Sequence, residues 1–172
     1  MNYLEILKDK NLKPKQKIEI ISQFLLNNSL RTNELIEIAN GLKEVDKANC
    51  IEAMEYASQK NPLIIDSFTF DFLIQCLSSK TPRIKWESAR VIANTAHQFP
   101  EKLEMATVSL LGNTEHEGTV VRWSAATALA QIIRLKTSLN SELFTALEVI
   151  IEKEEKNSIK KIYTAAIKKA IN

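Results

Sequence analysis

An internal repeat in the second half of the sequence constrains the fold more than any other feature. The segment T-V-V-R-W-S-A-A-T-A-L-A-Q-I-I-R-L at positions 119–135 aligns without a gap on the segment that begins at Pro82. The two copies lie 37 residues apart, and their register pairs Trp86 with Trp123. A period of about 40 residues is typical of stacked helix pairs, each of which buries its apolar face against the next. The repeat therefore predicts a helical stack, and it says much less about a partner.

Glycine and proline residues stand where helices are expected to end and begin. Glycine favours a helix C-terminus and proline the first helical turn. The chain has three glycines and four prolines: Gly41, Gly112, Gly118, Pro14, Pro62, Pro82 and Pro100. Together with the apolar periodicity they predict ten helices, near 2–10, 14–27, 32–39, 45–60, 66–77, 82–98, 101–111, 119–135, 141–154 and 158–171.

One of these segments also has the pattern of a strand. The stretch S-F-T-F-D-F at positions 67–72 alternates between polar and apolar residues. A single strand among helices would have no pairing partner, so we expect a helix there as well. Short connections and the lack of a linker-like stretch then predict one domain over 1–172. Its five helix pairs are expected near 1–28, 29–62, 63–99, 100–137 and 138–172.

The second helices of the last three pairs resemble HEAT repeats, of the kind found in small bacterial HEAT-repeat proteins. The residues that carry the resemblance are Val121, Arg122, Ala125, Ala126 and Leu129, with Ile84, Lys85, Ala89 and Ile92 in the preceding copy and Ile159, Lys160, Ala166 and Ile167 in the following one. The resemblance is clearest over 82–172. It implies an all-α fold, a right-handed α-solenoid of about five antiparallel helix pairs in an armadillo-like superhelix. It also implies that the second helices line the concave side.

Composition and motifs narrow the function classes. The net charge of +2 gives no argument for nucleic-acid binding from charge alone. The first ten residues carry charges every few positions and lack the apolar core expected of a signal peptide. No run is long enough to span a bilayer, and Cys50 and Cys76 have no metal-ligand spacing around them. We therefore expect a cytoplasmic protein. There is no phosphate-binding loop or nucleophile motif, and His116 with its two glutamate neighbours does not form a convergent metal site. We expect no enzyme activity, no cofactor and no metal.

Candidate binding residues lie on the polar arc of the second helices. At about 100° per residue, the helix near 82–98 buries an apolar face that contains Ile84, Val91 and Ile92. Its opposite arc holds Arg83, Trp86, Glu87, Arg90, Asn94 and His97. The next second helix is expected to expose Val120, Trp123, Ser124, Thr127, Gln131 and Arg134. The same register exposes Lys161 and Lys169 in the last pair and Asn49, Glu52 and Tyr56 in the second pair.

Two interpretations of the tryptophans stay open. Trp86 and Trp123 are the chain's two tryptophans, and each falls at the edge of the polar arc. Tryptophan offers a large contact area at low entropic cost, which favours a pair of anchors for a peptide or a base. Alternatively, each ring closes the gap between adjacent repeats. Lys85, Arg122 and Lys160 fall inside the apolar arc instead, and for them we expect a structural role in repeat-to-repeat contacts.

These observations favour a non-catalytic binding or scaffold protein. The partner would be a protein or an acidic peptide, with Trp86 and Trp123 as anchors and with Arg83, Arg90 and Arg134 paired with its acidic groups. Glu52 at one end and Lys161 with Lys169 at the other would orient an extended partner. The alternative is nucleic-acid binding through a basic, tryptophan-lined groove. A third possibility is a structural subunit whose groove binds nothing.

Overall fold

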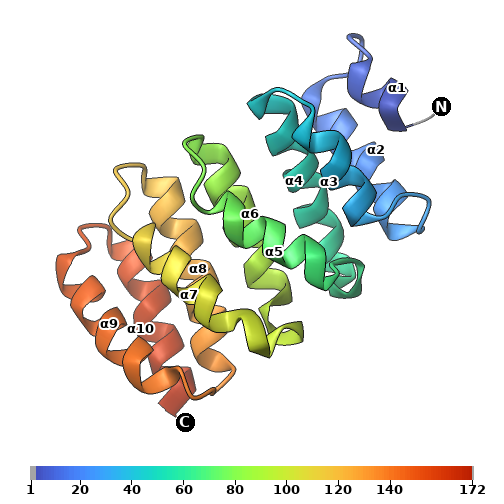
Figure 1. The fold of residues 1–172 in the computed structure, drawn as a ribbon. Helices are drawn as coiled ribbons and strands as arrows, with labels where there is room; N and C mark the ends of the chain where they lie inside the picture. The colour runs from blue at the N-terminus through green and yellow to red at the C-terminus, as the bar shows by residue number, and fades with distance from the viewer. Residues whose placement is uncertain (1–2, 172) are drawn as a thin grey trace.

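The computed structural model describes residues 3–171, and these residues form ten α-helices in five antiparallel pairs (Figure 1). The predicted all-α solenoid is confirmed. The first helices of the pairs are α1 (Tyr3–Lys8), α3 (Thr32–Asn40), α5 (Ser67–Cys76), α7 (Leu103–Gly112) and α9 (Asn140–Lys153). The second helices are α2 (Pro14–Leu26), α4 (Glu44–Lys60), α6 (Pro82–Thr95), α8 (Thr119–Arg134) and α10 (Asn157–Ile171). Short 3₁₀ turns are η1 (Pro62–Ile64), η2 (Ala96–Gln98) and η3 (Pro100–Lys102).

The stretch at 67–72 is helical, as predicted. Asp66 caps α5 by accepting a hydrogen bond from the backbone N–H of Thr69 at 2.7 Å. Phe70 and Phe72 are buried, whereas Phe68 is exposed. The alternating pattern therefore arises from a helix that buries most of its circumference and leaves one aromatic residue outside.

Two of the predicted helix boundaries were wrong at one connection. The helix predicted near 82–98 ends at Thr95 and continues as the tighter turn η2, and the helix predicted from 101 begins only at Leu103. Pro100 cannot donate a backbone hydrogen bond, and it occupies the first position of η3, where a helical turn does not need that donor. Phe99 packs against Phe70 with ring centroids 4.4 Å apart, which fixes the connection on the core. The predicted start at Asn2 lies outside the described residues.

The helices form two layers. In Figure 1 the first helices α3, α5, α7 and α9 lie in front, and the second helices α4, α6, α8 and α10 lie behind them. The core fills the space between the layers. Fully buried alanines such as Ala125, Ala126 and Ala128 let α8 approach the second helices on either side of it. The opposite side of the second-helix layer remains open to solvent.

Basic residues tie successive repeats together at their turns. Lys85 on α6 donates to the backbone carbonyl of Leu77 at 2.9 Å and to Oδ1 of Asn113 at 2.8 Å. Arg122, one repeat later, donates to the carbonyl of His116 at 2.9 Å and pairs with Glu154 at 3.0 Å. The structural role predicted for these two residues is confirmed. Within residues 3–171, no helix is long and apolar enough to cross a membrane.

Candidate functional site

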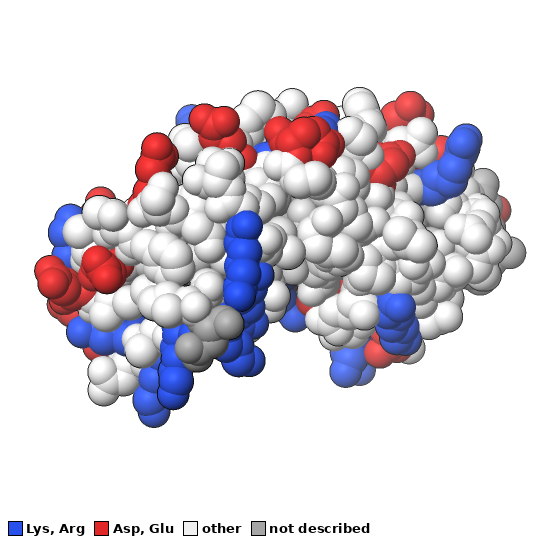
Figure 2. Space-filling view, turned by 90° about the horizontal axis from the view of Figure 1, so that it is seen from below, with Lys and Arg blue, Asp and Glu red and all other residues white. Residues whose placement is uncertain are grey.

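The candidate site is the exposed side of the second helices α4, α6, α8 and α10, here called the second-helix face. Seen from below, the molecule is indented on this side, along the lower edge of Figure 2. Most Lys and Arg side chains in that view project from the lower edge, and most Asp and Glu side chains gather along the upper edge, on the side of the first helices. The two layers of the solenoid therefore present surfaces of different charge.

The predicted site residues do not share one environment. Trp123 is 41% exposed, and His97, Lys161 and Lys169 are also exposed. The half-buried residues are Arg83, Trp86, Arg90, Asn94, Thr127, Gln131 and Arg134. Glu87, predicted to lie on the outward arc, is 3% exposed. That prediction was wrong because Glu87 lies on the side of α6 that packs against α4.

Two further residues of the predicted arcs are also buried. Ser124 has the same place on α8 that Glu87 has on α6, and it is fully buried. Asn49 on α4 is 3% exposed. A helix in a stack packs on three sides, against its own partner and against the helices before and after it. The solvent-facing arc is therefore narrower than a two-sided pattern of polar and apolar residues predicts.

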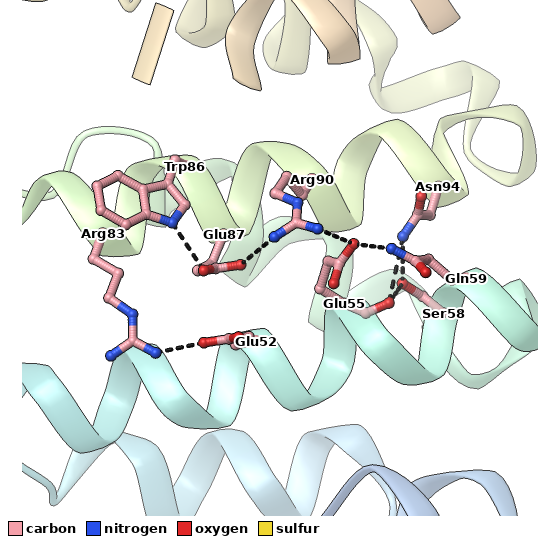
Figure 3. Close-up of polar contacts among 9 residues, drawn as sticks. All are labelled: Glu52, Glu55, Ser58, Gln59, Arg83, Trp86, Glu87, Arg90 and Asn94. Atoms are coloured by element: carbon pink, nitrogen blue, oxygen red, sulfur yellow. Dashed lines mark hydrogen bonds and ion pairs between the residues drawn. The ribbon is translucent and has the colours of Figure 1, made fainter. Parts of the chain in front are cut away.

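A network of charged residues joins α4 to α6 on this face (Figure 3). Arg90 lies between two buried carboxylates, 2.9 Å from Glu55 and 3.4 Å from Glu87. Arg83 pairs with Glu52 on α4. The indole N–H of Trp86 donates to Glu87 at 2.8 Å. Both arginines and the polar edge of this tryptophan are therefore bound within the chain.

The network continues along α4 and α6 toward their C-terminal ends. Asn94 donates to the hydroxyl of Ser58 at 3.0 Å and to the backbone carbonyl of Glu55 at 3.4 Å. Gln59 donates to the carboxylate of Glu55 (Figure 3). These contacts use most of the hydrogen-bonding capacity that the face offers along α6.

Burial changes the acidity of the two central carboxyls. Removal from water raises the pKa of Glu55 and of Glu87 above the ordinary value, and the nearby guanidinium of Arg90 only partly opposes this effect. One oxygen of Glu55, Oε2, is buried without a hydrogen-bond partner. The seam between α4 and α6 therefore contains two carboxyls that are costly to keep ionised.

The part of the face formed by α8 and α10 is different. Trp123 projects from α8, and neither its indole N–H nor the side-chain amide of Gln131 forms a hydrogen bond with a described residue. Arg134, Lys161 and Lys169 form no ion pair within residues 3–171, and Nε of Arg134 is buried without a partner. The outward donors of Trp123, Gln131, Arg134, Lys161 and Lys169 therefore remain largely unused by the described residues.

The two tryptophans are not equivalent, although the repeat places them in register. The sequence correctly placed both on the second helices. It did not reveal Glu55, whose burial depends on how α4 packs against α6. A possible signal was the local pair of Glu87 and Arg90, three residues apart, because such a pair has no counterpart in the next repeat.

The turn that contains His116 is held by structural hydrogen bonds. Nδ1 of His116 accepts a hydrogen bond from the backbone N–H of Gly118 at 2.9 Å. In the part of the chain that the structure describes, no three potential metal ligands converge at one point. An open pocket of about 300 Å³ lies between this turn and the turn before α10, lined in part by Arg122 and Glu154, which pair with each other.

The architecture is similar to that of designed armadillo repeat proteins. A computationally designed protein of this class, made for modular peptide recognition, matches 99% of this chain and 81% of its own chain, with a TM-score of 0.75 and 17% identity. A second, in complex with the peptide (KR)4, matches 99% of this chain and 80% of its own, with a TM-score of 0.70 and 17% identity. The chain has an armadillo-like solenoid fold. Identity this low shows the fold alone.

Comparison by sequence adds nothing to this. No protein-family model and no curated protein matches the sequence. Membership of the HEAT family in particular therefore stays a prediction, while the wider class of helical repeat solenoids is established by the fold.

Proposed function

We propose that this solenoid binds an extended segment of a protein partner along the second-helix face. The observation that carries the proposal is Trp123, a large aromatic side chain that is 41% exposed and whose indole N–H donates to no described residue. Exposed tryptophan is costly to leave in water, and it is among the residues that contribute most to protein interfaces. On the same face, Arg134, Lys161 and Lys169 have side chains for which no ion pair with a described residue is present.

The rigidity of the face supports the same function. The ion pairs of Arg90 with Glu55 and Glu87 fix α4 against α6, and the buried alanines of α8 fix it between its neighbours. A partner that binds a preformed surface incurs little ordering cost on the solenoid's side. Designed armadillo proteins with a similar fold were made for peptide recognition, and one is described in complex with a peptide. The proposed role is binding rather than catalysis.

The test is selection of peptides that depend on Trp123. A library of random linear peptides displayed on phage is panned against the wild-type chain and, separately, against Trp123→Ala. The matched control is Phe68→Ala, which removes an exposed aromatic side chain, 59% exposed, from the opposite layer. We expect peptides that bind the wild type and the Phe68 variant and lose at least about tenfold in affinity on Trp123→Ala. If no selected peptide depends on Trp123, the proposal is wrong.

A further inference from the structure

The second-helix face has two halves that differ in whether their polar groups already have partners. In the N-terminal half, formed by α4 and α6, Arg83 and Arg90 are paired with glutamates and Asn94 is bonded to Ser58. In the C-terminal half, formed by α8 and α10, the outward cations Arg134, Lys161 and Lys169 form no ion pair with a described residue. A ligand can therefore gain new polar contacts mainly in the C-terminal half.

The two halves also differ in charge. Three carboxylates and two guanidinium groups give the network of the N-terminal half a formal charge of −1. In the C-terminal half, Arg134, Lys161 and Lys169 give a formal charge of +3, and no acidic residue stands at the outward positions of α8. With the exposed Lys60 at the end of α4, the N-terminal half is close to neutral, so the positive charge of the second-helix face is concentrated on α8 and α10.

This asymmetry is encoded in the repeat itself. The network residues Arg83, Glu87 and Arg90 are replaced, 37 positions later, by Val120, Ser124 and Thr127. None of these replacements can form an ion pair. Both copies have a tryptophan, Trp86 and Trp123, but only the first copy has the charged residues of the network beside it. The second copy therefore lacks the carboxylate that would neutralise cations on its face, and Arg134 stands where the first copy has His97.

We infer that the partner segment carries acidic side chains where it crosses α8 and α10, and uncharged ones where it crosses α4 and α6. This inference rests on the proposed function and adds to it the chemistry and the register of the partner. Carboxylates of the partner would pair with Lys161, which has the same place on α10 that Trp123 has on α8, and with Arg134 and Lys169 nearer the C-terminal ends of these helices. Carboxylates placed over the N-terminal half would meet the surplus negative charge of its network.

An acidic peptide fits this surface better than a nucleic acid does. A nucleic-acid strand carries a negative charge on every nucleotide and needs a continuous basic path. Here the free cations are concentrated on α8 and α10, with Lys60 apart from them at the end of α4, and Glu52, Glu55 and Glu87 lie in between. The edge of Trp86 is also held by Glu87 and not by a ligand. A peptide can place its charges on one half only.

The experiment uses charge reversal in matched pairs. Lys161→Glu with Lys169→Glu reverses two cations on the second-helix face. Lys43→Glu with Lys80→Glu reverses two exposed lysines at turns between helices, neither of which has an ion-pair partner among the described residues. Each double variant changes the formal net charge from +2 to −2. The probes are the synthetic peptides selected through Trp123 and a single-stranded oligothymidylate, measured by isothermal titration at two salt concentrations.

We expect the selected peptides to be enriched in Asp and Glu at one end. We expect their affinity to fall about tenfold to thirtyfold in the variant of Lys161 and Lys169, and by less than about threefold in the control variant. Trp123-dependent peptides without acidic enrichment would overturn this inference and leave the proposed function standing. Loss of all dependence on Trp123 would overturn both. An oligothymidylate that binds more tightly than the peptides, and weakens equally in both variants, would also overturn the inference.

Discussion

Arg90→Met tests the role of the network between α4 and α6. The substitution keeps most of the aliphatic stem of the side chain and removes the one guanidinium that contacts both Glu55 and Glu87. The two carboxylates have side chains only 2% and 4% exposed, so water cannot replace the lost partner. The variant therefore leaves two buried negative charges side by side.

The size of the effect follows from this burial. Removing one partner of a fully buried ion pair costs about 3–5 kcal/mol of unfolding free energy. Arg90 itself is 32% exposed, and solvent screens part of its interaction. We expect a loss of about 2 kcal/mol near neutral pH, which lowers Tm by about 4–8 °C in a chain of this size. The exposed pair of Arg31 and Glu34, at 73% and 38%, gives the control Arg31→Met, for which we expect less than about 0.5 kcal/mol.

The pH dependence separates this mechanism from simple loss of packing. Burial raises the pKa of Glu55 and Glu87 in the folded chain, and removal of Arg90 raises it further. A folded chain that binds protons more tightly than the unfolded one is favoured at low pH, and this advantage is lost as the pH rises through the folded pKa. The deficit of the Arg90 variant should therefore shrink between about pH 7 and about pH 5.

The assay is urea unfolding followed by far-UV circular dichroism at both pH values, for the wild type, the Arg90 variant and the Arg31 control. Adding Glu55→Gln and Glu87→Gln to Arg90→Met should recover much of the stability, because no buried charge then remains. A loss that is the same at both pH values, or that is not recovered by the two glutamines, would refute the reasoning.

Two further predictions concern other parts of the solenoid. Arg122→Gln should lower the free energy of unfolding by about 3 kcal/mol, because Glu154, with a side chain 3% exposed, loses its partner. Burial acts to raise the pKa of Glu154, but hydrogen bonds from Arg122 and from the backbone N–H of Lys156 lower this pKa overall. The stabilisation by this ion pair is present above the pKa of Glu154 in the unfolded chain and is lost as the pH falls through its pKa in the folded chain. Urea unfolding in acid should therefore show a smaller stability loss for the Arg122 variant than at neutral pH. An equal loss at both pH values would contradict this prediction. Cys50 and Cys76 are buried, and burial raises their pKa to about 12 and about 11, so neither should react with a disulfide reagent near neutral pH until urea unfolds the chain. Rapid reaction in the native protein would show that these sites open locally.

The sequence predicted the architecture better than the site because the two depend on different information. The positions of Pro14, Pro82 and Gly118 and the apolar periodicity are local, and they placed the helices within a few residues. The burial of Glu87 depends on packing against helix α4, which lies more than 25 residues earlier in the chain. Helical phase alone cannot distinguish a polar residue that faces solvent from one that faces a complementary residue on the next helix.

The tryptophans show the same limit. Phase and repeat register placed both on the second helices and left open whether they anchor a partner or close the gap between repeats. The structure gives different environments to the two. Trp86 is half-buried and hydrogen-bonded to Glu87, whereas Trp123 is exposed and its indole N–H has no acceptor in the part of the chain that the structure describes. Near-identical helical positions therefore differ because the charges around them differ.

The most direct test of the central claim follows the two indole N–H resonances in ¹H–¹⁵N spectra while a peptide selected through Trp123 is added. The chain has two tryptophans, and Trp123→Phe assigns their signals. We predict that the Trp123 indole signal shifts together with backbone amides of α8 and α10, and that the Trp86 signal, held by Glu87, moves little. Shifts confined to the first helices α7 and α9, with both indole signals unchanged, would contradict binding on the second-helix face.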